Sequence, residues 1–137
     1  MLYYSSRSEK ETCTAAQAIV KGLASDGGLF IPSEIPAVSE DFIRELLSLD
    51  YKGRAVRILS LYLDEFTEEE LRTMAGEAYG HDFNAEGKNA PVRIIDDTTA
   101  VMELYHGPTC AFKDMALQIM PRLLVSSLRK TGEQREV

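Results

Sequence analysis

Lys113 lies in a segment that could present a reactive amine. The segment from His106 to Asp114 reads HGPTCAFKD, so a glycine and a proline form a turn before an apolar, helix-like run. A lysine that forms an imine with a carbonyl compound must be held at a fixed point and must lose its proton readily. Apolar residues flank Lys113 on both sides, namely Ala111, Phe112, Met115, Ala116 and Leu117. They predict that the stem of Lys113 is partly desolvated, which favours the neutral amine.

A surface lysine near the start of a helix would give the same local pattern. Such lysines are common, and a short motif taken alone matches many unrelated proteins. Local chemistry by itself therefore favours the surface interpretation over a lysine that carries a cofactor. A second, separate segment is needed to decide between them.

Two separate segments together resemble one enzyme family. Residues 103–118, which read ELYHGPTCAFKDMALQ, resemble the lysine motif of the threonine synthase family, a family of fold-type II pyridoxal phosphate enzymes. Residues 15–32, which read AAQAIVKGLASDGGLFIP, resemble the opening helix of that family and its following turn into a strand, and residues 2–7 fit the same start. Two matches in the expected order are more specific than either alone. The region from about 33 to 100 carries the resemblance weakly, and Cys110 stands where a more ordinary apolar or small residue is expected.

The resemblance implies a role for Lys113 as the catalytic lysine and as the residue that binds the cofactor, pyridoxal 5'-phosphate. The implied substrate is O-phospho-L-homoserine, which the family converts with water to L-threonine and phosphate by γ-elimination and β-addition of water. Lys113 would hold the cofactor as an imine, would be displaced by the substrate amine, and would then move protons.

The fold that the resemblance implies is α/β. Residues 1–90 are expected to form the amino-terminal accessory domain of the family, with helices and a small sheet. Residues 91–137 are expected to form the incomplete start of a tryptophan synthase β-like catalytic domain, which contains the lysine motif.

The resembled enzymes are several times longer than the 137 residues of this chain, so we expect the chain to be their amino-terminal part. A phosphate cradle needs a glycine-rich loop that leads into the amino terminus of a helix, and the sequence has none. Its one glycine pair, Gly27 and Gly28, is expected to end a helix instead. The last residues, 133–137, are expected to turn into a strand. We therefore expect the chain alone to be inactive.

Two alternatives stay open at this point. In the first, the chain belongs to a threonine synthase-like phospholyase that acts on another phosphorylated or hydroxylated amino acid. In the second, it is a stand-alone binding or assembly module that does not complete a cofactor pocket.

Composition predicts a folded cytoplasmic chain, with 45% apolar and 27% charged residues. Its apolar runs are too short to span a bilayer, and its start lacks the pattern of a secretory signal. The formal net charge of −7 argues against nucleic acid and anionic membranes as partners. Cys13 and Cys110 are expected to be reduced and structural. The acidic residues between 64 and 70 are expected to form a solvated face rather than a metal site, and the oligomeric state stays open.

Apolar spacing and capping residues predict four helical segments in the first 80 residues. Capping boxes begin the first segment, at Thr14 and Gln17, and the fourth, at Thr67 and Glu70. Gly53 is expected to separate the second from the third. The predicted bounds are 14–27, 39 to about 50, an apolar face over 55–63, and 67–80.

In the second half of the chain, polar residues and a glycine predict a loop over 81–90, which includes His81. Two strands, 92–95 and 100–105, joined by a turn, are predicted after it. A long helix is expected from Thr109 to about 130, with a kink or break where Pro121 removes a hydrogen bond.

Three polar residues around Lys113 allow more than one interpretation. His106 could contact a cofactor or substrate oxygen, or it could only shape the turn. Thr109 is expected to cap the helix that follows it. Asp114 is expected to point away from Lys113, because consecutive helical residues do not share a face, and to orient the segment.

Overall fold

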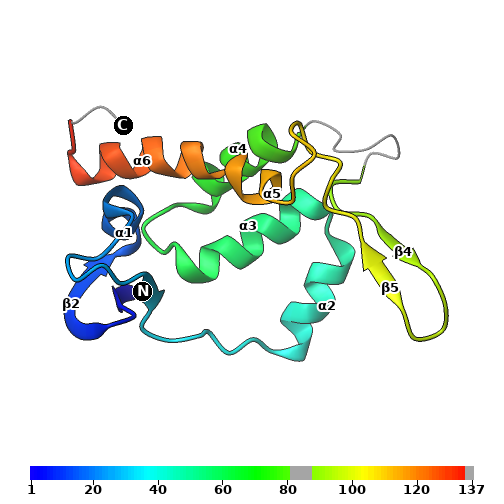
Figure 1. Ribbon diagram of the computed structural model, residues 1–137, viewed down its shortest axis with the longest axis horizontal. Helices are drawn as coiled ribbons and strands as arrows, with labels where there is room; N and C mark the ends of the chain where they lie inside the picture. The colour runs from blue at the N-terminus through cyan, green and yellow to red at the C-terminus, as the bar shows by residue number, and fades with distance from the viewer. Residues whose placement is uncertain (81–87, 135–137) are drawn as a thin grey trace.

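The computed structural model of the chain describes residues 1–80 and 88–134, within which helices alternate with short strands. The elements in chain order are β1 (Leu2–Ser5), β2 (Ser8–Thr14), α1 (Ala15–Lys21), β3 (Phe30–Pro32), α2 (Glu40–Ser48), α3 (Tyr51–Tyr62), α4 (Glu68–Tyr79), β4 (Val92–Ile94), β5 (Ala100–Met102), α5 (Asp114–Leu117) and α6 (Met120–Thr131). Figure 1 shows the sheet that contains β1 and β2 at one end of a layer of helices, and β4 and β5 projecting from the other end. The expected α/β class, with helices and small sheets, is confirmed.

The first sheet is antiparallel and has the order β2-β1-β3. Tyr3 on the central strand pairs with Cys13 of β2 and with Pro32 of β3. The sequence predicted the third strand but not the hairpin of β1 and β2. The residues of β2 read SEKETCT, and Cys13 is the fully buried residue among them, so the apolar alternation that signals a strand is weak there.

The core is built mainly from α1, α3, α4 and α6. Small side chains on α1 let α6 lie directly against it, since Ala15 and Ala16 are almost completely buried. The larger buried residues of this core are Val56, Leu63, Phe66, Leu71, Tyr79, Ile119 and Leu123. Residues before position 80 and after position 114 therefore share one core.

Helix α1 ends earlier than the sequence predicted. Gly22 adopts a left-handed φ of 72°, and its N–H donates to the carbonyl of Ala18, so the helix stops after Lys21. Gly27, the expected stop, has a φ of 77° and lies in the turn that follows. Leu23, which lies within the predicted bounds 14–27, follows the end of the helix and is largely exposed.

The predicted separation of the second and third helices is also displaced. Asp50 caps α3 by accepting a hydrogen bond of 2.8 Å from the N–H of Gly53, which places Gly53 inside the first turn. The break lies at Leu49 and Asp50 instead. The predicted start of α2 at Ser39 and the capping box of Thr67 and Glu70 at α4 are confirmed.

The two predicted strands in the second half are confirmed but shorter, as β4 and β5. They pair in antiparallel fashion, with Val92 opposite Met102 and Ile94 opposite Ala100. All six residues of the two strands are exposed. The predicted polar loop around His81 falls largely on residues 81–87, and the predicted final turn falls partly on 135–137; both stretches lie outside the described residues.

The long helix predicted after Thr109 is two helices, α5 and α6. Pro121 lies in the first turn of α6, where a helix does not need its missing N–H. The predicted break at this proline is therefore confirmed. None of the helices that the structure describes is long and apolar enough to cross a membrane.

Candidate functional site

Lys113 lies at the amino end of α5, three residues after the turn formed by residues 107–110. Its carbonyl oxygen accepts hydrogen bonds from the N–H groups of Ala116, at 3.0 Å, and Leu117, at 2.8 Å. The N–H of Asp114 donates to the carbonyl of Ala111 at 3.0 Å. The backbone on both sides of Lys113 is therefore held by local hydrogen bonds. Residues 107–113 are called the lysine turn below.

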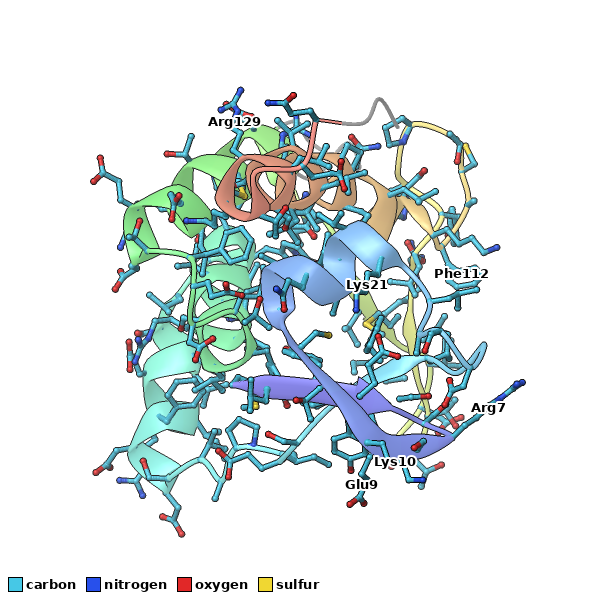
Figure 2. The ribbon with its side chains drawn as sticks, turned by 90° about the vertical axis from the view of Figure 1, so that its left-hand side faces the viewer. Arg7, Glu9, Lys10, Lys21, Phe112 and Arg129 are labelled. Carbon is cyan, nitrogen blue, oxygen red and sulfur yellow. The ribbon has the colours of Figure 1, made fainter. Side chains whose placement is uncertain are left out.

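The side chain of Lys113 is exposed, as are its neighbours Ala111, Phe112, Ala116 and Leu117. Phe112 is 65% exposed and lies at the periphery of the molecule in Figure 2. The single-turn helix α5 directs Asp114 into the core and leaves most of its other side chains outside. The predicted desolvation of the lysine stem is thus wrong for the part of the chain that the structure describes.

Asp114 holds the lysine turn from inside the molecule. It is 1% exposed, and its two carboxylate oxygens both accept hydrogen bonds from Thr109. The N–H of Thr109 donates to Oδ2 and the hydroxyl Oγ1 donates to Oδ1, each at 2.8 Å. The prediction that Asp114 points away from Lys113 is confirmed. Its bonds to Thr109 support the prediction that it orients the segment.

The predicted helix cap at Thr109 is wrong. An N-cap hydroxyl accepts a hydrogen bond from a backbone N–H two or three positions later, whereas the hydroxyl of Thr109 donates to a carboxylate five positions later. The residue in the capping position of α5 is Lys113 itself, which makes no side-chain capping bond.

Gly107 and Cys110 complete the geometry of the turn. The N–H of Cys110 donates to the carbonyl of Gly107 at 3.0 Å. Cys110 has a φ of 58°, a conformation that is unfavourable for a residue with a side chain. Its thiol is exposed.

His106, just before the turn, is hydrogen-bonded to a carboxylate. Its Nε2 lies 2.7 Å from Oε2 of Glu103, and Nε of Arg93 donates to Oε1 of Glu103 at 2.9 Å. The bond from His106, followed by that from Arg93, lowers the pKa of Glu103. Glu103 is buried. Because it binds both Arg93 of β4 and His106, its carboxylate connects the β4–β5 hairpin to the residue that precedes the lysine turn. A direct chemical role for His106 stays a prediction.

Tyr79 connects the lysine segment to the helical core. Its hydroxyl donates to the carbonyl of Met115, two residues after Lys113, at 2.7 Å. Its ring packs edge-on against Tyr51 with 5.0 Å between centroids, and burial raises the pKa of Tyr79 to about 12. Sequence reasoning missed Tyr79, although an aromatic residue in the last turn of a predicted helix was the available signal.

Four of the five acidic residues between 64 and 70 bind groups of the protein itself. The contacts are Asp64 with the ammonium of Met1, Glu65 with the N–H of Ala16, Glu68 with Arg72, and Glu70 with Lys130. A groove of about 660 Å³ beside them, between α4 and α6, is crossed by ion pairs such as that of Arg122 with Glu77, at 3.0 Å. The ion pairs of Glu70 with Lys130 and of Glu77 with Arg122 connect α4 to α6.

Together, the fold and the lysine turn define a class: an α/β domain that presents one lysine from a glycine-proline turn. The family described as "Threonine synthase N terminus" matches residues 2–79. The chain therefore belongs to the threonine synthase family.

Individual relatives agree with this assignment over 79% to 98% of the chain. Threonine synthase of Schizosaccharomyces pombe is 36% identical over 137 residues, which cover 98% of this chain. "Threonine synthase-like 1" of Homo sapiens is 40% identical over 111 residues, 79% of this chain and 15% of that protein. The solved structure of threonine synthase of Brucella melitensis with bound pyridoxal phosphate has a TM-score of 0.88 and 35% identity over 98% of this chain. The chain spans only 26% of the S. pombe protein and 29% of the Brucella chain.

Proposed function

We propose that this chain is the part of a threonine synthase that supplies the cofactor-binding lysine, Lys113. The observation that carries the proposal is the similarity to the pyridoxal phosphate-bound Brucella enzyme, which covers 98% of this chain and so extends through the lysine turn. The fixed backbone around Lys113 supports it, because a lysine that binds a cofactor must be held in place.

The residues of this chain fit the aldehyde group of pyridoxal phosphate, which could react with Lys113. The exposed amine of Lys113 can reach a carbonyl group, and the turn before it is held by buried contacts. The chemistry that pyridoxal phosphate supplies when bound is an aldehyde for condensation with a lysine amine, which releases water, and a ring that takes up carbanion charge. No glycine-rich loop for its phosphate occurs in the sequence. The chain therefore offers the point of attachment and not the phosphate cradle.

The substrate of the complete protein would be O-phospho-L-homoserine, and the products threonine and phosphate. In that reaction Lys113 would serve as the base and acid that moves protons near the cofactor, since a neutral lysine amine can accept a proton and return it. Exclusion of water from Lys113 would depend on groups outside the described residues, because its neighbours in this chain leave it exposed. For this reason we propose that the chain alone has no turnover.

A different phosphorylated amino acid is the second candidate substrate. The 40% identity to the human protein "Threonine synthase-like 1" motivates it, because the relatives of this chain are not limited to proteins named threonine synthase. Phosphate release by the complete protein, measured in parallel with O-phosphohomoserine and with other phosphorylated amino acids, would distinguish the two candidates.

We also propose the division into an accessory domain, residues 1–90, and the start of a catalytic domain, residues 91–137. The match of the amino-terminal family to residues 2–79 supports a boundary after that point. Because α6 shares the core of α1, α3 and α4, the two parts would fold together rather than independently.

Reductive trapping tests the role of Lys113 directly. The chain is mixed with pyridoxal phosphate, reduced with borohydride and digested, and the modified lysines are identified by mass spectrometry. Before reduction, we expect a visible absorbance band that is lost in Lys113→Ala. After reduction, we expect preferential modification of Lys113 over exposed Lys10. The matched control, Lys10→Ala, should keep the band. If Lys113→Ala and the unmodified sequence behave alike, the chain is an inert module instead.

A separate assay tests the proposed inactivity. Phosphate release from O-phosphohomoserine is measured with the chain and pyridoxal phosphate, with Lys113→Ala as the blank. Release at the rate of an ordinary enzyme, about 1 per second or faster, would contradict the proposal.

A further inference from the structure

We propose that Asp114 is a positioning residue for Lys113: its carboxylate closes the lysine turn from inside the molecule and thereby fixes where the lysine side chain begins. The inference rests on the proposed role of Lys113. It adds a second residue to the site, one that acts through the backbone and does not touch the reacting atoms.

The first support is the hydrogen bonding of Asp114. Both carboxylate oxygens are occupied by one residue, Thr109, through its N–H and its hydroxyl, each at 2.8 Å. Hydrogen bonds to an ionised acceptor are stronger than those between neutral groups. Because the carboxylate is 1% exposed, water cannot easily replace Thr109 as a partner. The pair therefore closes the chain between positions 109 and 114.

The second support is the packing of Gly107 against Asp114. A Cβ placed on Gly107 would lie 2.4 Å from Oδ2 and 2.5 Å from Cβ of Asp114. Such distances are far below van der Waals contact, so the carboxylate occupies the space that a side chain at position 107 would need. Asp114 can therefore occupy its buried position only when residue 107 is a glycine.

The third support is the backbone conformation of Cys110. A non-glycine residue with a φ of 58° is held in a sparsely populated region only when its surroundings determine it. Two contacts surround it here: the bond from its own N–H to the carbonyl of Gly107, and the Asp114–Thr109 pair that flanks it. Releasing the pair would let the turn relax toward an ordinary conformation.

Lys113 and Asp114 lie on opposite sides of the chain. Asp114 is buried while Lys113 is exposed, as expected for consecutive residues at a helix start. The carboxylate thus acts on the lysine through one peptide unit and not by direct contact. A shift of the turn would move the base of the lysine side chain and reduce its preference for reaction with an aldehyde.

The experiment compares four variants of the chain. Asp114→Asn keeps the size of the side chain but replaces one acceptor oxygen with a donor. Thr109→Val removes the hydroxyl at nearly constant shape, and Thr109→Ser retains the hydroxyl. Asp97→Asn makes the same charge change in the exposed turn between β4 and β5 and is the matched control.

Two quantities are measured for each variant. Hydrogen exchange at the amide of Thr109 reports closure of the turn and does not involve the cofactor. Borohydride trapping with pyridoxal phosphate gives the ratio of modified Lys113 to modified Lys10. We expect Asp114→Asn to speed the exchange by about tenfold or more, because the amide loses a charged acceptor, and to lower the trapping ratio several-fold. Thr109→Val should lower the ratio by less, while Thr109→Ser and Asp97→Asn should leave both quantities unchanged.

Faster exchange in Asp114→Asn with an unchanged trapping ratio would overturn the positioning role. If Asp114→Asn does not fold, Thr109→Val and Thr109→Ser decide, and equal trapping ratios in these two variants would overturn the proposal. Failure of the proposed function is recognised separately, because the unmodified sequence would then show no preference for Lys113 while the amide of Thr109 stayed protected. In that case the positioning role falls with it.

Discussion

The two antiparallel β arrangements of this protein differ in what covers them. The sheet of β1, β2 and β3 contributes buried residues, Ser5 and Cys13, and lies beside the helices. The hairpin of β4 and β5 exposes every residue of both strands, including Val92, Ile94 and Val101. In Figure 1 it projects away from the helical layer.

Two kinds of interaction stabilise the two regions of the molecule. The helical layer is stabilised by apolar burial, with Leu71 and Ala75 completely buried at its centre. The hairpin and the lysine turn are held by polar side chains instead, through Glu103, Asp114 and Tyr79. We expect substitutions in the two regions to differ in size and in what they change.

The largest effect should come from Leu71→Ala in the helical layer. Removing a completely buried leucine leaves a cavity and should lower the free energy of unfolding by about 3 kcal/mol. Val101→Ala in the exposed hairpin should change it by less than about 0.5 kcal/mol. Urea unfolding followed by circular dichroism measures both, and equal losses would contradict the distinction between the regions.

Tyr79→Phe should have the next largest effect, because it breaks a contact between the two regions. The carbonyl of Met115 would lose the bond from the Tyr79 hydroxyl, at a cost of about 1 to 2 kcal/mol. Amide exchange in α5 should quicken more than exchange in α3. Tyr62→Phe, at the last residue of α3, is the control. An equal change of exchange in α5 for both variants would show that the Tyr79 hydroxyl does not specifically stabilise α5.

A smaller, pH-dependent effect on stability is expected at the first sheet. Glu11 of β2 accepts hydrogen bonds from Lys21 and Ser25. The bond from Lys21, and to a smaller extent that from Ser25, lowers the pKa of Glu11 from 4.5 to about 2. A lowered pKa means that this contact stabilises the fold fully above pH 4.5 and that its contribution is lost as the pH falls toward 2.

Titration of the Glu11 carboxyl by NMR checks this. Lys21→Met should raise the pKa of Glu11 toward its ordinary value, whereas Lys10→Met should leave it nearly unchanged. An unaltered pKa of Glu11 in Lys21→Met would show that the ion pair does not form in solution.

The smallest effect on stability should come from Lys113→Ala. Its side chain is exposed and makes no capping bond, so the free energy of unfolding should change by less than about 0.5 kcal/mol. Thermal unfolding measures this. A loss above 1 kcal/mol would assign Lys113 a structural role, which its exposure does not predict.

Local signals were the most predictable part of the fold. The capping boxes at Thr14 and Thr67, the cap at Ser39 and the break at Pro121 all depend on residues within one helical turn of each other. The end of α1 was misplaced because two glycine positions, 22 and 27, could each end a helix. The choice between them depended on how the following loop packs.

The amino-acid sequence was sufficient to predict the presence of the main helices, the break before α6 and the resemblance that singles out Lys113, since these depend on neighbouring residues or on whole motifs. The tertiary structure alone decided which side chains meet. It brought Tyr79 to Met115, 36 positions away, and left Lys113 exposed where its apolar neighbours predicted burial. Burial depends on which surfaces other elements cover, and spacing along one segment does not contain that information.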